Sequence, residues 1–353
     1  MRQAALLLFV AISLAGAERW RIQFPRDQKR SDFSINDLKF ASPTSGVAVG
    51  QLGQGRKRKP VALVTGDSGD TWSFLNTKEV GLSLFFLNER AGWMLTAGCL
   101  WKTVDSGRHW TKLAAGLVAD GALAVYFLDE NRGWVAGRHK SVYSTSDGGK
   151  HWSLVGAAEA VDSNPVYTSY NWIAFANSRA GMITGDSLPP QPGPERPRQE
   201  LPHLTIFLDT RDGGESWKAS TVSMFGRVTK VLFRADGQGL GLIEFQAGFE
   251  YPSEVFRIDA KTGKSWRVFR RANCAVTDIA LTAAGTAYLA AVEPRGGKRP
   301  GKLKLFESQD LETWSEVEVD DRATARRAKL AAADATHAWL ATDTGLILRQ
   351  SSE

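Results

Sequence analysis

Three carboxylates in the middle of the sequence are of the type that could cleave a glycosidic bond. Such reactions use a pair of Asp or Glu side chains, one as an acid and the other as a base or nucleophile. Asp186, Glu244 and Glu250 could supply this pair, and Tyr251 directly follows the last of them. The sequence does not fix the separation of these carboxyl groups. A catalytic pair is therefore one hypothesis, and no residue is assigned a catalytic role from the sequence alone.

Clusters of basic residues are the second feature that could do chemistry, because they attract anions. The segment 51–60 has four successive cations and no acid, and a second basic run lies within 293–302. We predict that such cations bind an acidic protein segment, an anionic glycan or a lipid head group. The alternative is a solvated surface that keeps the protein soluble. The predicted binding residues are Arg56, Lys57, Arg58, Lys59, Arg270, Arg271, Arg295, Lys298, Arg299, Arg326 and Arg327.

A repeated motif indicates the elements that position these side chains. It reads TGDSGDTW at 65–72, TVDSGRHW at 103–110, TSDGGKHW at 145–152 and TRDGGESW at 210–217. Two degenerate copies follow, DAKTGKSW at 259–266 and SQDLETW at 308–314. The spacing of the motif is close to the 40–50 residues, roughly, of a propeller blade. The shared positions of the four good copies are Asp67, Gly69, Trp72, Asp105, Gly107, Trp110, Asp147, Gly149, Trp152, Asp212, Gly214 and Trp217.

Each copy of the motif is typical of a tight turn between two strands. The Asp side chain can accept backbone N–H bonds within the turn, and the Gly can adopt a positive φ. The Trp then begins the next strand and packs against a neighbouring sheet. A calcium loop is the alternative, but it needs several oxygen ligands and each copy offers one carboxylate. We therefore predict structural turns and no metal site.

The sequence around each turn predicts a unit of four strands, which is a blade of a β-propeller. The first strands of the units are expected near Ile35, Ser83, Ala124, Asn171, Val228, Val276 and Ala328. The last unit lacks the motif, so the strand at 20–24 is expected to complete it and close the ring. The predicted fold is all-β: one domain over 18–353, a seven-bladed propeller of four-stranded antiparallel blades.

This fold places the predicted functional residues on one face. If the strands of a blade are labelled A to D, the A–B and C–D turns lie on one face and the B–C and D–A loops on the other. The longer loops at 51–60, 187–203, 246–252 and 293–301 are B–C loops. The basic residues lie in these loops or in D–A connections, over neighbouring blades 6, 7 and 1. We predict that a partner binds this B–C/D–A face.

The repeated turn resembles the Asp-box, or bacterial neuraminidase (BNR) repeat. The string GWVAGRHKSVYSTSDGGKHW at 133–152 also resembles the repeat of the photosystem II stability and assembly factor-like family. That resemblance implies an exported, non-enzymatic, seven-bladed ring that binds a partner subunit through an arginine patch. Asp boxes also occur in sialidases, so a sialidase-like or other glycoside hydrolase, or a glycan-binding propeller, is the alternative. The sialidase Phe/Tyr-Arg-Ile-Pro segment has its nearest counterpart in Phe24-Pro25-Arg26-Asp27, where the order differs.

The first residues predict export. Arg2, an apolar run over 4–14 and Ala15-Gly16-Ala17 form a signal peptide over 1–17. The apolar run is too short to span a bilayer. An uncleaved N-terminal anchor is the alternative. The mature chain is expected to be periplasmic or secreted, without a transmembrane segment.

The composition excludes several other classes of protein. The 353 residues include 34 Gly and 12 Trp but only 2 Cys and 5 His, and the formal net charge is +6. A disulfide framework, a metal site and a cofactor are not predicted. Cys99 and Cys274 lie in different blades and are expected to be free thiols. The export signal and the lack of aromatics among the cations argue against nucleic acid.

Two further expectations concern assembly and one loop. We expect a monomer. The segment 187–203 contains six prolines and is expected to be a stiff surface loop, with a ligand for a proline-recognition domain as the alternative.

Overall fold

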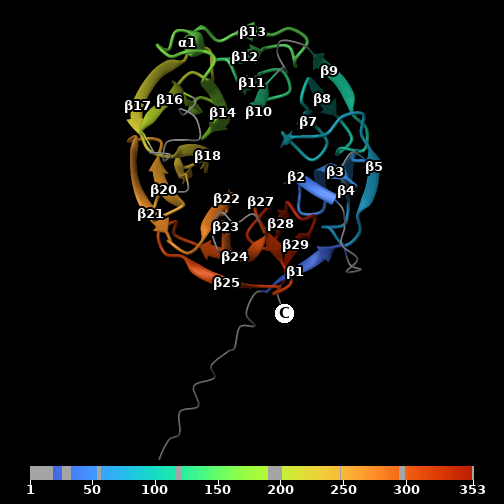
Figure 1. Cartoon of the computed structure of the whole chain (residues 1–353). Coiled ribbons are helices and arrows are strands. Elements are labelled where there is room, and N and C mark those ends of the chain that lie inside the picture. The colour runs from blue at the N-terminus through green and yellow to red at the C-terminus, as the bar shows by residue number, and fades with distance from the viewer. Residues whose placement is uncertain are drawn as a thin grey trace, which may run out of the picture.

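The chain forms a ring of four-stranded antiparallel sheets around a central axis (Figure 1). The computed structural model describes residues 19–25, 33–53, 57–115, 121–189, 201–246, 248–293 and 299–351. Five sheets have four strands each, and a nine-stranded sheet combines two further blades. The predicted all-β, seven-bladed propeller is confirmed.

The strands of each blade follow one another from the axis outward, as A, B, C and D, and blades are numbered from β2. The A strands are β2 (Phe33–Phe40), β6 (Ser83–Phe86), β10 (Ala122–Phe127), β14 (Thr168–Phe175), β18 (Arg227–Phe233), β22 (Ala275–Leu281) and β27 (Ala328–Ala332). The B strands are β3 (Gly46–Leu52), β7 (Gly92–Leu95), β11 (Gly133–Gly137), β15 (Gly181–Ser187), β19 (Gln238–Glu244), β23 (Ala287–Glu293) and β28 (Ala338–Thr342).

The outer strands complete the blades. The C strands are β4 (Lys59–Thr65), β8 (Cys99–Thr103), β12 (Val142–Thr145), β16 (His203–Thr210), β20 (Ser253–Asp259), β24 (Gly301–Ser308) and β29 (Ile347–Ser351). The D strands are β5 (Ser73–Asn76), β9 (Thr111–Ala115), β13 (Ser153–Leu154), β17 (Lys218–Met224), β21 (Lys264–Arg270), β25 (Ser315–Val319) and β1 (Arg19–Phe24). Two short elements are α1 (Gly156–Glu159) and β26 (Thr324–Ala325). Each residue near which a first strand was expected lies within an observed A strand.

The N-terminal strand closes the ring, as predicted. β1 pairs antiparallel with β29, from Arg19 opposite Ser351 to Phe24 opposite Ile347, and so becomes the D strand of blade 7. It also pairs in parallel with β25 of blade 6 through Arg19 and Trp20. The two ends of the chain therefore share one blade, and Figure 1 shows β1 beside β29. The predicted signal peptide, 1–17, lies outside the described residues.

The repeated motif forms the predicted C–D turns. In blade 1 the Thr65 hydroxyl donates to Asp67 (2.7 Å), and it accepts the N–H of Gly69 (2.9 Å). Asp67 also accepts the N–H of Thr71 at 2.9 Å. Gly69 has a φ of 86°, a left-handed conformation that glycine adopts readily. The same bonds recur in the other three good copies.

The geometry that these turns share leads to a prediction on pH. Bonds donated by the Ser216 hydroxyl and amide, and by the Thr210 hydroxyl, hold the pKa of Asp212 well below its usual value. The ionised carboxylate therefore stabilises the fold above its unfolded pKa of about 4, and this contribution is lost as the pH falls. We expect the melting temperature of Asp212→Asn to lie below that of the wild type at about pH 6 and to approach it in acid.

Asp209 in the same blade provides a matched control for this prediction. Burial raises the pKa of Asp209, so its ionisation opposes folding as the pH rises. The melting temperature of Asp209→Asn, relative to the wild type, should therefore rise between about pH 2 and pH 6. If the melting temperatures of both variants, relative to the wild type, changed with pH in the same direction, the opposite pKa shifts of Asp209 and Asp212 would be contradicted.

Phenylalanine and tryptophan rings join neighbouring blades. Trp93 of blade 2 stacks on Phe127 of blade 3 with ring centroids 3.8 Å apart. Trp339 of blade 7 stacks on Phe40 of blade 1 at 3.4 Å, and the box tryptophan Trp72 meets the edge of the same phenylalanine. The phenylalanine at the end of an A strand is thus held between two tryptophans. The surplus of tryptophan is used for packing between and within blades.

The glycine that precedes a tryptophan at the start of a B strand has a different role from the turn glycines. A Cβ atom at Gly133 would lie 2.5 Å from the ring of Phe127. The glycine is therefore required by the close approach of the ring. This requirement explains the Gly-Trp pairs at the start of the B strands.

The cysteines are free and buried, as predicted. Burial raises the pKa of the Cys274 thiol to about 11. A thiol of such high pKa carries little thiolate at neutral pH and is a poor nucleophile. No helix of the described residues has the length and apolar character needed to cross a membrane.

Candidate binding face and central channel

The B–C/D–A face carries the loops that sequence analysis singled out. Within the described residues, the B–C loops begin after Leu52, Ser187, Glu244 and Glu293, and the D–A connections precede β18, β22 and β27. The Asp-box turns lie on the opposite face, because they join C and D strands. The predicted separation of structural turns from candidate binding loops therefore follows from the observed strand order.

The predicted cations are placed in several parts of this face. Lys57, Arg58 and Lys59 are exposed at the start of β4, and Arg299 is exposed before β24. Arg270 and Arg271 end β21 or follow it, and Arg326 and Arg327 precede β27. Arg56, Arg295 and Lys298 lie outside the described residues.

Four of the predicted arginines, in blades 5 to 7, are ion-paired. Arg327 forms two bonds to Glu244 at 2.7 and 2.8 Å, and Arg326 binds Asp343 at 2.8 Å. The other two pairs are Arg271 with Glu316 (3.3 Å) and Arg270 with Glu254 (3.5 Å). These acids reduce the positive charge that an incoming partner would meet. Lys57, Arg58, Lys59 and Arg299 have no such ion pair among the described residues.

An aromatic cluster on the same face was not anticipated from the sequence. Phe225 lies in the D–A connection between blades 4 and 5 and is 42% exposed. Its ring centroid is 5.3 Å from that of Phe249, which is 5.0 Å from that of Phe245. Phe245 and Phe249 belong to the B–C loop of blade 5, and Leu201 at the end of the proline-rich loop is 63% exposed. Phe245 and Phe249 are half-buried, so the cluster presents Phe225 to solvent. Exposed apolar side chains on one face are typical of binding surfaces.

The central channel of the ring is the second candidate site. The A strands surround a cavity of about 520 Å³. Its lining includes Lys39, Lys230, Lys329 and Asp37, together with apolar side chains such as Trp172 and Phe233. Lys230 is buried and donates to Asp278 at 2.8 Å, and Lys39 donates to Asp37 at 3.0 Å. The channel is thus both charged and apolar.

Comparison with known proteins relates this fold to one family. The family described as photosynthesis system II assembly factor YCF48 matches residues 69–187, from the first Asp box to the end of β15. Over this segment the chain is similar to that family, and the ring is called a Ycf48-like β-propeller below.

A relative of the Ycf48-like propeller supports the same relationship. The photosystem II assembly lipoprotein Ycf48 of Synechococcus sp. (strain CC9902) is 23% identical over 223 residues. The match covers 58% of this chain and 60% of that protein, so it spans less than two thirds of the relative.

Solved structures agree on the fold of the Ycf48-like propeller. A structure titled YCF48 bound to D1 peptide has a TM-score of 0.62 and 16% identity, and covers 95% of this chain and 97% of that chain. A GH74 xyloglucanase from Xanthomonas campestris has a TM-score of 0.55 and 14% identity, over 87% of this chain and 50% of that one. At these identities the likeness establishes the propeller fold alone.

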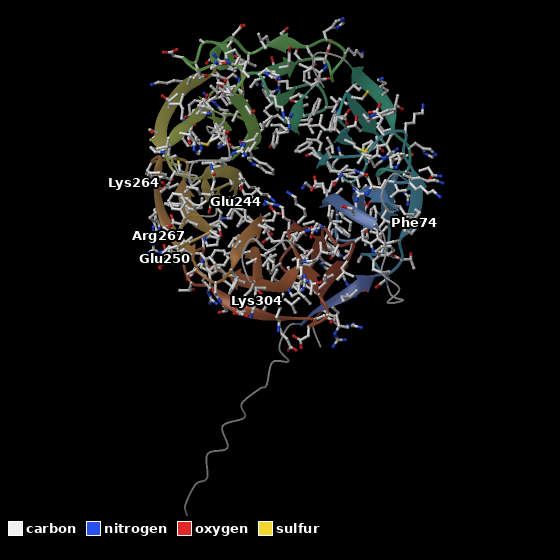
Figure 2. All side chains as sticks on the ribbon, viewed as in Figure 1. Phe74, Glu244, Glu250, Lys264, Arg267 and Lys304 are labelled. Carbon is white, nitrogen blue, oxygen red and sulfur yellow. The ribbon has the colours of Figure 1, made fainter. Side chains whose placement is uncertain are left out.

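The three carboxylates of the glycosidase hypothesis do not form an open pair in the Ycf48-like propeller. Asp186 is 3% exposed and accepts bonds from Arg227 and Asn171, both at 3.0 Å. Glu244 is held by Arg327. Figure 2 shows Glu250 at the outer rim of blade 5, farther from the axis than Glu244. The first two carboxylates are thus occupied by arginines, which disfavours them as a general acid and base.

The described residues contain no group of three or more His, Cys, Asp or Glu side chains placed to hold a metal ion. The Asp-box carboxylates are engaged within their own turns.

Proposed function

We propose that this Ycf48-like propeller is an exported, non-enzymatic scaffold that binds a protein partner through its B–C/D–A face. The observation that carries the proposal is the aromatic cluster of Phe225, Phe245 and Phe249. It lies on the same face as Lys57, Arg58, Lys59 and Arg299, which form no ion pair within the part of the chain that the structure describes. A solved YCF48 structure with a D1 peptide supports a protein ligand for a propeller of this kind.

The chemistry of the face favours a partner with acidic and apolar residues. Aromatic side chains of a binding surface contribute most of the affinity when a partner buries them. Exposed cations at the rim mainly increase the rate of association and select an acidic partner. We assign a structural role to the ion-paired arginines, such as Arg327, which hold the loops of this face in place. Their charge is already compensated by acidic side chains.

Location and assembly belong to the same proposal. A signal peptide over 1–17 would export the chain to the periplasm or out of the cell, and the Synechococcus relative is described as a lipoprotein. We propose a monomeric mature chain over 18–353 that forms a single propeller domain. A photosynthetic role rests on resemblance to the Ycf48 proteins.

Binding to a partner is expected to require both parts of the face. The wild-type chain would first capture the partner from the exported fraction, and its affinity would be measured with the purified partner. We expect Phe225→Ser combined with Phe249→Ser to weaken binding about tenfold or more, because the aromatic anchors are removed. We expect Lys57→Glu, Arg58→Glu and Arg299→Glu together to slow association by a similar factor.

Two exposed lysines of the opposite face provide the control for this experiment. Lys261 and Lys264 lie in the C–D hairpin of blade 5, and Figure 2 shows Lys264 at the outer edge of the ring. Lys261→Glu with Lys264→Glu changes the net charge without touching the proposed face. Equal loss of binding in this control, or unchanged binding in either test variant, would contradict the proposal.

A further inference from the structure

The central channel has one lysine more than its carboxylates can pair. Asp37 is bound by Lys39 at 3.0 Å, and Asp278 by Lys230 at 2.8 Å. Lys329 also lines the cavity, and among the described residues it has no ion pair. Lys329 is half-buried, and Asp278 acts on its charge only from beyond ion-pair distance. The three lysines carry one positive charge more than the two aspartates balance.

The two aspartates cannot turn to serve this third lysine. Asp37 accepts the N–H groups of Leu38 (2.9 Å) and Leu84 (2.8 Å), the second of which belongs to the next blade. Asp278 accepts the N–H of Leu330 in the next blade at 2.7 Å. Each carboxylate thus links two A strands, and moving it would leave buried amides without partners. The excess positive charge is fixed by the fold.

The channel wall also has an apolar part. Trp172, Ile173, Phe233 and Leu281 belong to its lining. Its volume of about 520 Å³ lies within the 300–1,000 Å³ range, roughly, of small-molecule sites. A ligand that satisfies both parts of the wall would carry one negative charge on an apolar body. A single carboxylate matches a single unpaired ammonium better than a doubly charged phosphate does.

We propose that the central channel binds a carboxylate attached to a compact apolar group, with Lys329 as its principal cation and Lys39 beside it. The carboxylate can come from the free C-terminus of a peptide or from a small carboxylic acid. The proposal stands on residues of the A strands and does not depend on partner docking at Phe225 or Lys57. Failure of one proposal therefore leaves the other intact.

Titration calorimetry with four probes tests this site. The probes are 3-phenylpropionate, its amide, the dipeptide N-acetyl-Leu-Phe with a free carboxylate, and the amide of that dipeptide. We expect one or both acids to bind and both amides to bind at least about tenfold more weakly, because the amides lack the charge. Binding of the dipeptide acid alone identifies a peptide C-terminus, and binding of phenylpropionate identifies a small acid. Absence of binding by both acids overturns the proposal.

Substitutions of Lys329 tie this binding to the channel. Lys329→Gln should weaken binding of the acid about tenfold or more, whereas Lys329→Arg should retain most of it. Lys264→Gln removes the same charge at the exposed rim and should leave the affinity unchanged. Because Lys329 has no ion pair among the described residues, the Gln variant is expected to fold, which its melting temperature verifies. Wild-type affinity in Lys329→Gln would overturn the proposal.

Discussion

Replacing Trp20 by alanine is expected to lower the free energy of unfolding by about 3–5 kcal/mol, the usual cost of truncating a fully buried tryptophan. Trp20 has no exposed surface and meets the ring of Tyr288 edge-on, with centroids 5.7 Å apart. It belongs to β1, so it packs where the N-terminal strand closes the ring. Its indole N–H has no hydrogen-bond partner among the described residues, which leaves packing as the source of its contribution.

Trp266 is the matched control for this substitution. It is 40% exposed, and the guanidinium of Arg257 lies 5.2 Å from its ring centroid. Loss of such a partly exposed contact should cost about 1 kcal/mol or less. Chemical denaturation of the two alanine variants measures the difference. Similar losses in Trp20→Ala and Trp266→Ala would show that closure by β1 adds no special stability.

The fold could be predicted because its signals are local and repeated. The Thr65, Asp67 and Gly69 interactions occur within one turn, so a short string of sequence specifies them. The alternation of such turns with apolar strands then fixes the number of blades. The pairing of β1 with β29 could also be inferred, because the last blade lacked its own D strand.

The binding face was only partly predictable because its charges pair over long distances in the chain. Arg327 and Glu244 are 83 residues apart, and their ion pair brings together loops of blades 5 and 7. Sequence analysis located these arginines but had no means of assigning their acidic partners. The aromatic cluster was missed for the same reason, since Phe225 and Phe249 come from different loops.

The charged residues that β2 and β18 place in the channel were missed because irregular strand pairing determines which of their residues reach it. The pairing register of β2 shifts between Ile35 and Asp37, and that of β18 shifts between Val228 and Lys230. Such bulges redirect the side chains that follow them. Strict alternation along the A strands would therefore have assigned these charged residues to the wrong side.

Breaking the Lys230–Asp278 ion pair is the second substitution that we expect to reduce stability strongly. Burial lowers the pKa of Lys230, while the Asp278 carboxylate opposes this change. Asp278→Ala removes the counter-ion and leaves both a buried ammonium and the N–H of Leu330 without a partner. Removing one member of a buried ion pair typically costs about 3–5 kcal/mol, and we expect a loss of this size at neutral pH.

The dependence of this loss on pH distinguishes a buried charge from lost packing. A lysine whose pKa is lower in the folded state releases its proton more readily when folded, so stability rises with pH between the folded and unfolded pKa values. The melting temperature of Asp278→Ala should therefore recover toward that of the wild type above neutral pH. The double variant Lys230→Met, Asp278→Asn removes both charges and retains an acceptor for Leu330, so it should restore most of the stability and show no such recovery. A constant deficit in Asp278→Ala at every pH would instead assign the loss to packing and to the Leu330 amide.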